Sequence, residues 1–455
     1  MKQIRGFIQR ALPKGSFRSN VSVLAAGAFL SQALLMLASP ILTRVYTSED
    51  FGFLQVYLSI SVFLIGVASL RYETAVLIPK DEETAANVMA VAFSTIVLLT
   101  STCALVTWLL LSTTNYGSPG LRVCIALLSA GMCAAATCQL LANWFTRRSR
   151  FDQIARTKLQ QIVVMLVSQI ALGFWGWGFV GLVLGDVLGK ATGIWRLAKM
   201  AHREDGYLFQ KVSFAGMKSV ASRFKAFPLL STWSVLINTA GYAIPTLLIT
   251  AWYGPTVAGF LALAERVTIA PASIIAYAVC NVYSSRLATM AHSKPEQLPA
   301  FFIRMAATLF LLGLPLSCVF AFAGPTVFSI VFGEAWQESG HYARLLSGLT
   351  ALVVVTAAVT QTLNILERQS LQLVWDIFRA VFTCGVVYAV HVAQCSSYVA
   401  VLAYSAALTI SYFVLLAMSF MACVSHARAA RASSANPPID NCMPTPRHAD
   451  VAIQA

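Results

Sequence analysis

Twelve stretches of apolar residues, each long enough to cross a bilayer, occupy most of this chain. A helix needs about 20 residues to cross the hydrocarbon core. Only 11% of the residues are charged, against about 25% in soluble globular proteins, so the chain has too little charge to cover a water-facing surface. We expect an all-α integral membrane protein with spans near 21–43, 52–78, 84–111, 120–145, 153–175, 178–200, 227–252, 256–285, 301–322, 342–366, 371–392 and 397–423.

Basic residues collect in every second connection between these stretches. They lie near the N-terminus and within 147–158, 196–225, 286–304 and 428–447, whereas the alternate connections are uncharged or carry acids only. Lys and Arg favour cytoplasmic loops, so both termini are predicted to be cytoplasmic. The rule also accounts for the net charge of +14 without nucleic acid as a partner, because residues spread over separate loops form no single binding stripe.

The two halves of the chain share a short pattern. "PILTRVYTSEDFGFL" begins at Pro40 and "PTLLITAWYGPTVAGFL" at Pro245, and in each a proline, a short crossing and Gly-Phe-Leu follow in order. An even number of spans between the copies predicts a pseudo-twofold axis along the membrane normal. We expect an N-terminal six-helix bundle (1–200), a basic cytoplasmic linker (201–226), a C-terminal six-helix bundle (227–424) and a disordered cytoplasmic tail (425–455).

The stretch "GLVLGDVLGKATG" (181–193) combines glycine at every fourth position with one acid and one base. Small residues at this spacing let membrane helices approach closely, so the glycines predict a packing face. Asp186 and Lys190 are four residues apart and are expected to pair. Charges inside a membrane are functional candidates, although an internal salt bridge with a purely structural role is an equal alternative here.

Other charged residues also fall inside or at the ends of apolar stretches, and together they predict a polar cavity between helices. Bases outnumber acids among them, which suits an anionic passenger, and Arg matches phosphate oxygens bidentately. The candidate substrate-binding residues are Arg44, Arg71, Lys190, Arg266 and Arg379. The candidate ion-coupling residues are Glu73, Asp186 and Glu265.

Motifs of enzymes and of cofactor or metal sites are absent from the sequence. It contains no GxxxxGK[ST] phosphate-binding loop, no HExxH and no GxSxG. The cysteines form no CxxC or zinc spacing. We therefore predict a non-enzymatic protein without cofactor or metal, in which an ion gradient or the passenger's own gradient drives transport.

The assembled pattern resembles the polysaccharide (O-antigen-type) flippases of the multidrug/oligosaccharidyl-lipid/polysaccharide exporter (MOP) superfamily. The resemblance rests on the order and spacing of several segments over roughly residues 18–424. These segments are "PILTRVYTSEDFGFLQVYLSI", "RYETAVLIP", "NWFTRRSRFDQIA", "GLVLGDVLG", "FPLLSTWSVLINTAGYAIPTLLI", "GFLALAERVTIAP" and "GPTVFSIVFGEAWQESGHYARLL".

The resemblance implies two six-helix bundles (a MATE-like fold) around a central cationic cavity in a bacterial inner membrane. It implies movement of an undecaprenyl-diphosphate-linked oligosaccharide to the periplasmic leaflet, coupled to H⁺ or Na⁺, with membrane lipid around it and polysaccharide polymerase and chain-length proteins as candidate partners. Arg71, Lys190 and Arg266 would then attract the diphosphate and acidic sugars. Arg44, Arg71, Glu73, Arg266 and Arg379 fall at the family's polar positions, whereas the Asp186–Lys190 pair departs from its pattern.

Two alternatives remain open. A multidrug/cation antiporter of the same superfamily would favour an acidic cavity. A membrane glycan polymerase or ligase would need a sizeable outer loop for its catalytic groups. The longest predicted outer connection, 323–341, is short and offers only Glu334, Glu338 and His341.

Overall fold

The computed structural model describes residues 17–113 and 119–435, and the regular structure in this part of the chain is helical. The helices are α2 (Phe17–Val45), α3 (Ser48–Ala68), α4 (Tyr72–Ala75), α5 (Glu82–Thr113), α6 (Pro119–Arg147), α7 (Phe151–Phe174), α8 (Gly178–Phe209), α9 (Phe214–Arg223), α10 (Thr232–Tyr253), α11 (Pro255–Ser293), α12 (Leu298–Phe332), α13 (Gln337–Ile365), α14 (Gln369–Val392) and α15 (Ser397–Ala435). A π-helical turn, Phe227–Ser231, leads into α10, and 3₁₀ turns precede α12 and α13.

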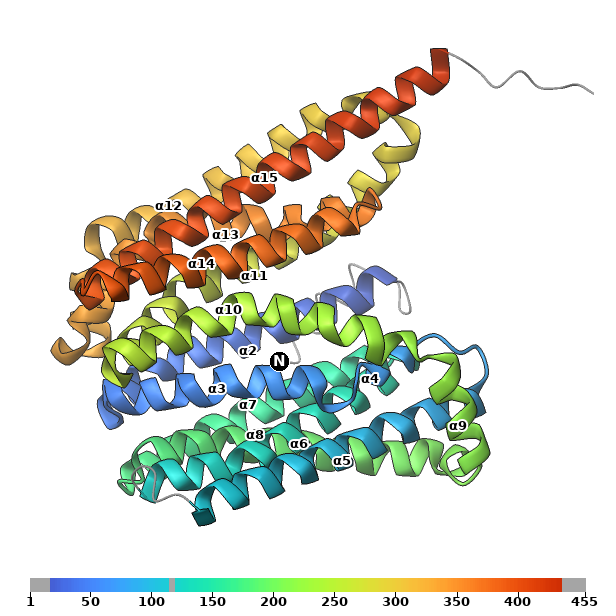
Figure 1. The fold of residues 1–455 in the computed structure, drawn as a ribbon, viewed down its shortest axis with the longest axis horizontal. Coiled ribbons are helices and arrows are strands. Elements are labelled where there is room, and N and C mark those ends of the chain that lie inside the picture. The colour runs from blue at the N-terminus through green and yellow to red at the C-terminus, as the bar shows by residue number, and fades with distance from the viewer. Residues whose placement is uncertain (1–16, 114–118, 436–455) are drawn as a thin grey trace, which may run out of the picture.

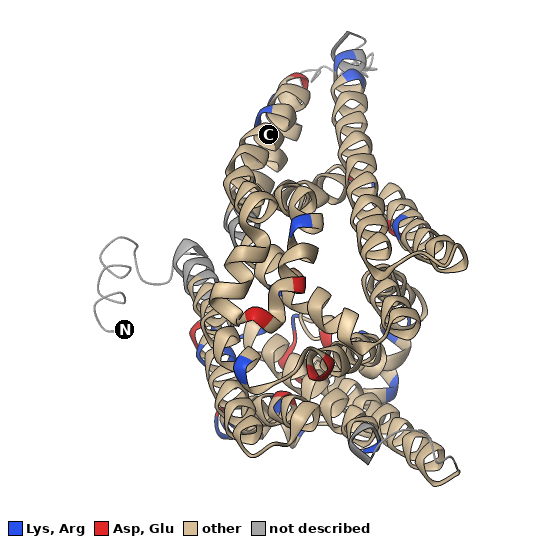
Figure 2. Cartoon of the chain, turned by 90° about the vertical axis from the view of Figure 1, so that its left-hand side faces the viewer, with Lys and Arg blue, Asp and Glu red and all other residues tan. Residues whose placement is uncertain are grey.

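Eleven helices in the described residues are long and apolar enough to cross a membrane. The remaining predicted span, 256–285, lies within the long helix α11. Most of the ribbon carries neither acidic nor basic residues when the molecule is viewed from one end (Figure 2). The predicted all-α membrane fold is therefore confirmed, while the count of twelve spans and the cytoplasmic termini stay predictions. The first 16 residues lie outside the described part of the chain.

The predicted second span, 52–78, is too long. Helix α3 ends at Ala68, and the short helix α4 begins only at Tyr72. Between them Leu70 and Arg71 have positive φ angles of 49° and 64°. Two consecutive left-handed residues cannot continue a right-handed helix, so the chain turns at the end of α3 instead of crossing as one rod.

Helical structure extends further than expected at two other places. Helix α8 runs on to Phe209 and α9 follows, so much of the predicted linker 201–226 is helical. Helix α15 continues to Ala435, so the prediction of disorder is wrong for residues 425–435. That segment, "SHARAARASSA", is rich in alanine, which has the highest helix propensity. The rest of the predicted tail, 436–455, lies outside the described residues.

The long helices run side by side along one direction of the molecule (Figure 1). In that view α5 to α9 form the lower part, α2, α3 and α10 the middle, and α11 to α15 the upper part. Helix α3 packs against both α10 and α11, and thereby joins the first half of the chain to the second.

A close backbone crossing at one end of the molecule joins α3 to α11. A Cβ atom added at Gly52 would collide with the carbonyl oxygen of Pro255, and one added at Gly259 would collide with that of Ser48. The same spacing along the chain separates Ser48 from Pro255 and Gly52 from Gly259. The two contacts are therefore related by a two-fold operation, which supports the repeat predicted from these glycines.

The glycine row of α8 forms the expected packing face. A Cβ atom at Gly189 would lie 2.7 Å from the carbonyl oxygen of Gln161, and one at Gly181 would lie 3.0 Å from Cβ of Leu172, both on α7. The turn between α7 and α8 is also where the sequence predicted it, with Gly176 at φ 76°. The glycines thus allow α7 and α8 to approach closely.

Candidate functional site

A cavity of about 940 Å³ lies between the two halves of the chain. Helices α2, α3, α7 and α8 line one side, and α10, α11, α13, α14 and α15 line the other. Its described lining carries three charged residues, Asp186, Glu265 and Arg266. The rest of the lining is apolar, aromatic or uncharged polar, and its amide and aromatic members are Gln32, Phe51, Gln55, Gln169, Asn238, Tyr242, Gln372, Trp375, Tyr404 and Tyr412.

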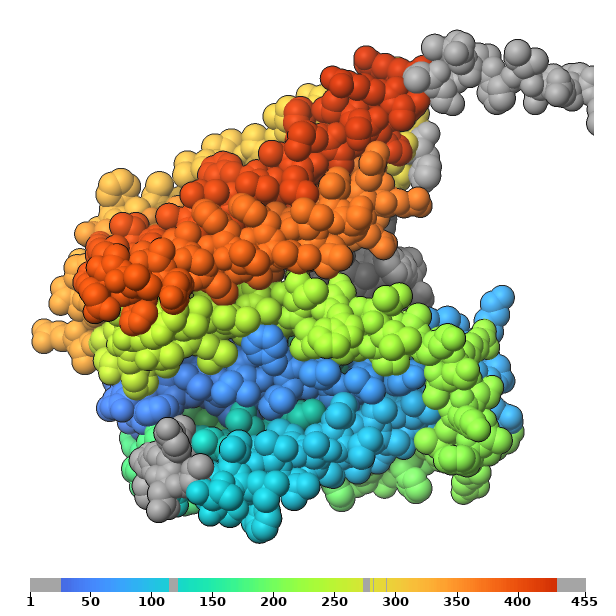
Figure 3. Space-filling view, in the orientation of Figure 1, coloured from blue at the N-terminus to red at the C-terminus, as the bar shows by residue number. Residues whose placement is uncertain are grey.

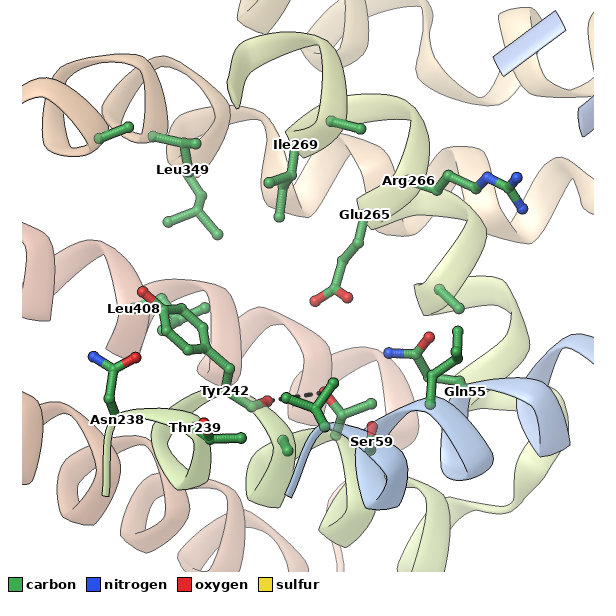
Figure 4. A pocket seen from close by; sticks show the side chains of 18 of the residues that line it. Gln55, Ser59, Asn238, Thr239, Tyr242, Glu265, Arg266, Ile269, Leu349 and Leu408 are labelled. Atoms are coloured by element: carbon green, nitrogen blue, oxygen red, sulfur yellow. Dashed lines mark hydrogen bonds between the residues drawn. The ribbon is translucent and has the colours of Figure 1, made fainter. Parts of the chain in front are cut away.

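Glu265 projects from α11 into the middle of this cavity, between Leu349 and Ile269 on one side and the side chains of α10 and α3 on the other (Figure 4). Its Oε1 accepts a hydrogen bond of 3.2 Å from the hydroxyl of Tyr404 on α15. The ion pairs found in the described part of the chain do not include Glu265. A carboxyl group in such a position can exchange a cation or a proton with the cavity.

Arg266 is the next residue of α11, but its guanidinium points away from the carboxylate of Glu265 (Figure 4). Its Nη2 lies 3.4 Å from the backbone oxygen of Leu35 on α2. Arg266 therefore places positive charge where α2 and α11 meet, at the boundary between the two halves.

Asp186 and Lys190 form the ion pair expected from their spacing, with 2.6 Å between Lys190 Nζ and Asp186 Oδ2. The same oxygen lies 3.3 Å from the hydroxyl of Tyr57 on α3. Asp186 lines the cavity, whereas Lys190 is not among its lining residues. The pair therefore presents a neutralised carboxylate to the cavity rather than an open positive charge.

Arg379 lies behind the cavity wall and is fully buried. Its guanidinium carbon lies 3.7 Å from the ring centroid of Tyr242 and 4.7 Å from that of Trp375. Its Nη2 donates 3.1 Å to the backbone oxygen of Asn238 and lies 3.4 Å from Asp376 Oδ1. Arg379 thus holds cavity-lining residues in place and does not itself line the cavity.

The other predicted site residues lie outside the described lining. Arg71 pairs with Glu73 at 2.9 Å where α3 ends, and the Ser69 hydroxyl donates to the other carboxylate oxygen of Glu73. Asn143 Nδ2 donates 2.9 Å to the backbone oxygen of Glu73. Arg44 is exposed near the opposite end of the molecule, at the C-terminal end of α2.

The cavity is therefore less basic than the sequence suggested. Two carboxyl groups and one guanidinium line its described part, while the other predicted bases are paired, buried or distant. Sequence reasoning missed the uncharged side chains, notably Asn238, Tyr242 and Gln372. The polar run "INTAGY" inside the span 227–252 was the available signal. Within the described residues no group of three or more His, Cys, Asp or Glu side chains could hold a metal ion.

Two sets of membrane helices around a central, mainly uncharged cavity define a transporter-type integral membrane protein. Residues 41–341 match the family described as "Polysaccharide biosynthesis protein". That range covers more than half of the sequence. The chain therefore belongs to this family, and the resemblance to polysaccharide exporters of the MOP superfamily is confirmed.

Individual relatives agree with this family. The chain is 22% identical over 354 residues to the succinoglycan biosynthesis transport protein ExoT of Rhizobium meliloti (strain 1021), covering 76% of this chain and 69% of that protein. Its fold is similar to an inward-facing MATE family transporter of the MOP superfamily (TM-score 0.66, 15% identity, 91% of this chain and 99% of the other).

The fold is also similar to the lipid II flippase MurJ in an inward closed conformation (TM-score 0.70, 10% identity, 92% of this chain and 93% of the other). At these identities the solved structures indicate the fold alone. The family and ExoT indicate a multi-pass membrane protein of polysaccharide biosynthesis and transport, rather than a catalytic enzyme.

Proposed function

We propose that this protein is a flippase that moves an undecaprenyl-diphosphate-linked oligosaccharide from the cytoplasmic to the periplasmic leaflet of the bacterial inner membrane. The observation that carries the proposal is the central cavity of about 940 Å³ between the two halves. The family supports a saccharide, and a lipid-linked saccharide must pass its polar part through the bilayer while its tail remains in lipid.

The two ends of the cavity differ. At the end that carries the α2–α3 and α10–α11 connections, the Gly52 and Gly259 contacts bring α3 and α11 together, and Trp336 Nε1 donates 2.9 Å to the backbone oxygen of Thr43. Towards the other end, α14 and α15 diverge from α10 and α3 (Figure 3). By the distribution of basic residues, the wider end faces the cytoplasm. This arrangement corresponds to an inward-open, outward-closed state of an alternating-access cycle.

The charged residues have separate roles in this proposal. Arg71, at the wider end, meets the diphosphate as it approaches, and Arg266 holds it where α2 and α11 meet, so that the lipid tail stays between the halves. Guanidinium groups suit this role because they bind phosphate oxygens bidentately.

Glu265 is the proposed coupling site for H⁺ or Na⁺. The carboxylates of Asp186 and Glu73 are each paired with a base, whereas Glu265 has a hydroxyl partner and faces the cavity. Among the three carboxyl groups predicted from the sequence, Glu265 is therefore the best placed to gain or lose a cation during the cycle.

A multidrug/cation antiporter is the second candidate, because two acids and several aromatic rings in the lining would also suit a cationic drug. A glycan polymerase or ligase has little support, because only residues 333–336 separate α12 from α13, where the longest outer connection was predicted.

Reconstitution tests the proposal. The purified protein is placed in liposomes with a fluorescent polyprenyl-diphosphate disaccharide, and an impermeant quencher reports which leaflet holds the lipid. Faster exchange between leaflets than in protein-free liposomes is expected, and Arg266→Ala should slow it. Arg304→Ala serves as the matched control, because Arg304 is exposed on α12 and lies outside the described lining. Transport of ethidium without any exchange of the glycolipid would favour the antiporter.

A further inference from the structure

Tyr242 presents a flat aromatic surface to the cavity. Its side chain projects from α10 beside Asn238 and Thr239 (Figure 4), and the residue is 47% exposed although it lies in the middle of the molecule. The guanidinium of Arg379 occupies one face of the ring, with its carbon 3.7 Å from the ring centroid. The opposite face is left for a ligand.

The ring and its neighbours are held rigidly. Arg379 lies between Tyr242 and Trp375, and Trp375 Nε1 donates 2.7 Å to the backbone oxygen of Ser411. Asn238 Nδ2 donates 2.7 Å to Asp376 Oδ1, which fixes its amide and leaves its carbonyl oxygen as an acceptor. A surface fixed before binding loses little conformational entropy when a ligand arrives.

Gln372 supplies a second, independent sign of a ligand. It lines the same cavity from α14, and its Oε1 is buried without a hydrogen-bond partner. A buried acceptor without a donor costs free energy. If this amide turns towards the cavity, a hydroxyl group of a bound molecule supplies the missing donor.

The chemistry of this wall matches an uncharged sugar. A pyranose ring has C–H faces that pack on the negative face of an aromatic ring, and its rim of hydroxyl groups donates to amide oxygens. An acidic sugar would bring a carboxylate to this wall. The charged lining residues on the same half of the chain are Glu265 and Arg266. Because Arg266 points away (Figure 4), the nearby charge would be that of Glu265, which has the same sign as the sugar carboxylate. The charge of Arg379 is shared with Asp376 behind the wall.

We infer that Tyr242, Asn238 and Gln372 form a subsite for an uncharged sugar of the passenger, in which a pyranose stacks on Tyr242 and its hydroxyl groups donate to the two amides. The inference rests on the proposed flippase function and specifies its substrate class. It also revises the expectation of acidic sugars, because the bases that suggested them do not line this wall.

Binding of two matched probes to the purified full-length protein tests the subsite. One is a polyprenyl-diphosphate disaccharide that ends in glucose, and the other carries glucuronic acid in place of that glucose. The wild-type protein is expected to bind the glucose probe about tenfold more tightly, equivalent to about 1.4 kcal/mol. Tyr242→Ala should remove that preference, and Tyr242→Phe should retain it.

Tyr398→Ala is the control, because Tyr398 is 41% exposed at the start of α15 and lies outside the described lining. Gel filtration shows whether each variant is folded. Equal binding of both probes, tighter binding of the glucuronic acid probe, or an unchanged preference in folded Tyr242→Ala would overturn the subsite but leave the flippase standing. Failure of the wild-type protein to bind either probe would instead reject the flippase, and the subsite with it.

Discussion

Substitution of Gly259 by alanine should shift the protein away from the proposed outward-closed state. Gly259 lies on α11 where the backbone of α3 crosses it, and an added Cβ would collide with the Ser48 carbonyl oxygen and lie 3.0 Å from the backbone nitrogen of Gly52. These are backbone atoms of a helix, so no flexible side chain can move aside. The methyl group fits only if the two helices separate.

The size of the shift follows from the cost of overpacking. Extra carbon in a tightly packed interface costs about 1–3 kcal/mol, and the cost disappears once α3 and α11 have moved apart. The equilibrium should therefore move about 5–150-fold towards the outward-open state. Alanine also favours helix over glycine by about 1 kcal/mol in either state, so the variant should still fold.

Labelling from the periplasmic side measures this shift. In a background without native cysteines, Thr239→Cys lines the cavity, and an impermeant thiol reagent reports outward access. Gly385→Ala is the matched control, because Gly385 lies in helix α14 and nothing is within 4 Å of an added Cβ. If Gly259→Ala were labelled no faster than Gly385→Ala, the α3–α11 crossing would not be the outer closure.

Three further outcomes are expected. Glu265→Gln should make transport in proteoliposomes independent of a pH or Na⁺ gradient, since it removes the carboxylate at the proposed coupling site; a gradient response equal to wild type would exclude that role. Arg379→Met should lower the unfolding free energy in detergent by about 3–5 kcal/mol because buried Asp376 loses its positively charged partner, and adding Asp376→Asn should recover much of it; no recovery would refute the pairing argument. Lys190→Met should lower the unfolding free energy less than Arg379→Met does, because the Asp186–Lys190 pair is partly exposed. Calorimetry of the two variants would compare their stabilities.

Much of the fold could be predicted because the bilayer limits what an apolar chain can form. Length and hydropathy located most of the spans, and four-residue spacing located both the glycine face of α8 and the Asp186–Lys190 pair. The break after Ala68 could not be predicted, because neither leucine nor arginine is a residue type that favours the left-handed conformation which Leu70 and Arg71 adopt. At residues 425–435 the overall polarity of the segment predicted disorder, whereas its alanine content favours a helix. The segment is helical.

The candidate site was predictable only in part. Charges inside apolar stretches are conspicuous, so Glu265, Arg266 and Asp186 could be selected from sequence, and they do line the cavity. Which face of a helix each charge occupies depends on tertiary packing, so the burial of Arg379 behind Tyr242 was not foreseeable. Uncharged amides and tyrosines are common in packed membrane helices, and their gathering on one wall becomes visible only in three dimensions.

The most direct test of the flippase proposal is the leaflet distribution of lipid-linked oligosaccharide in cells that lack this gene, with and without the gene restored. The proposal predicts that the glycolipid accumulates on the cytoplasmic leaflet of the inner membrane and that the intact gene relieves the accumulation. Normal display on the periplasmic leaflet, with unpolymerised units building up there, would contradict it and indicate a polymerase instead.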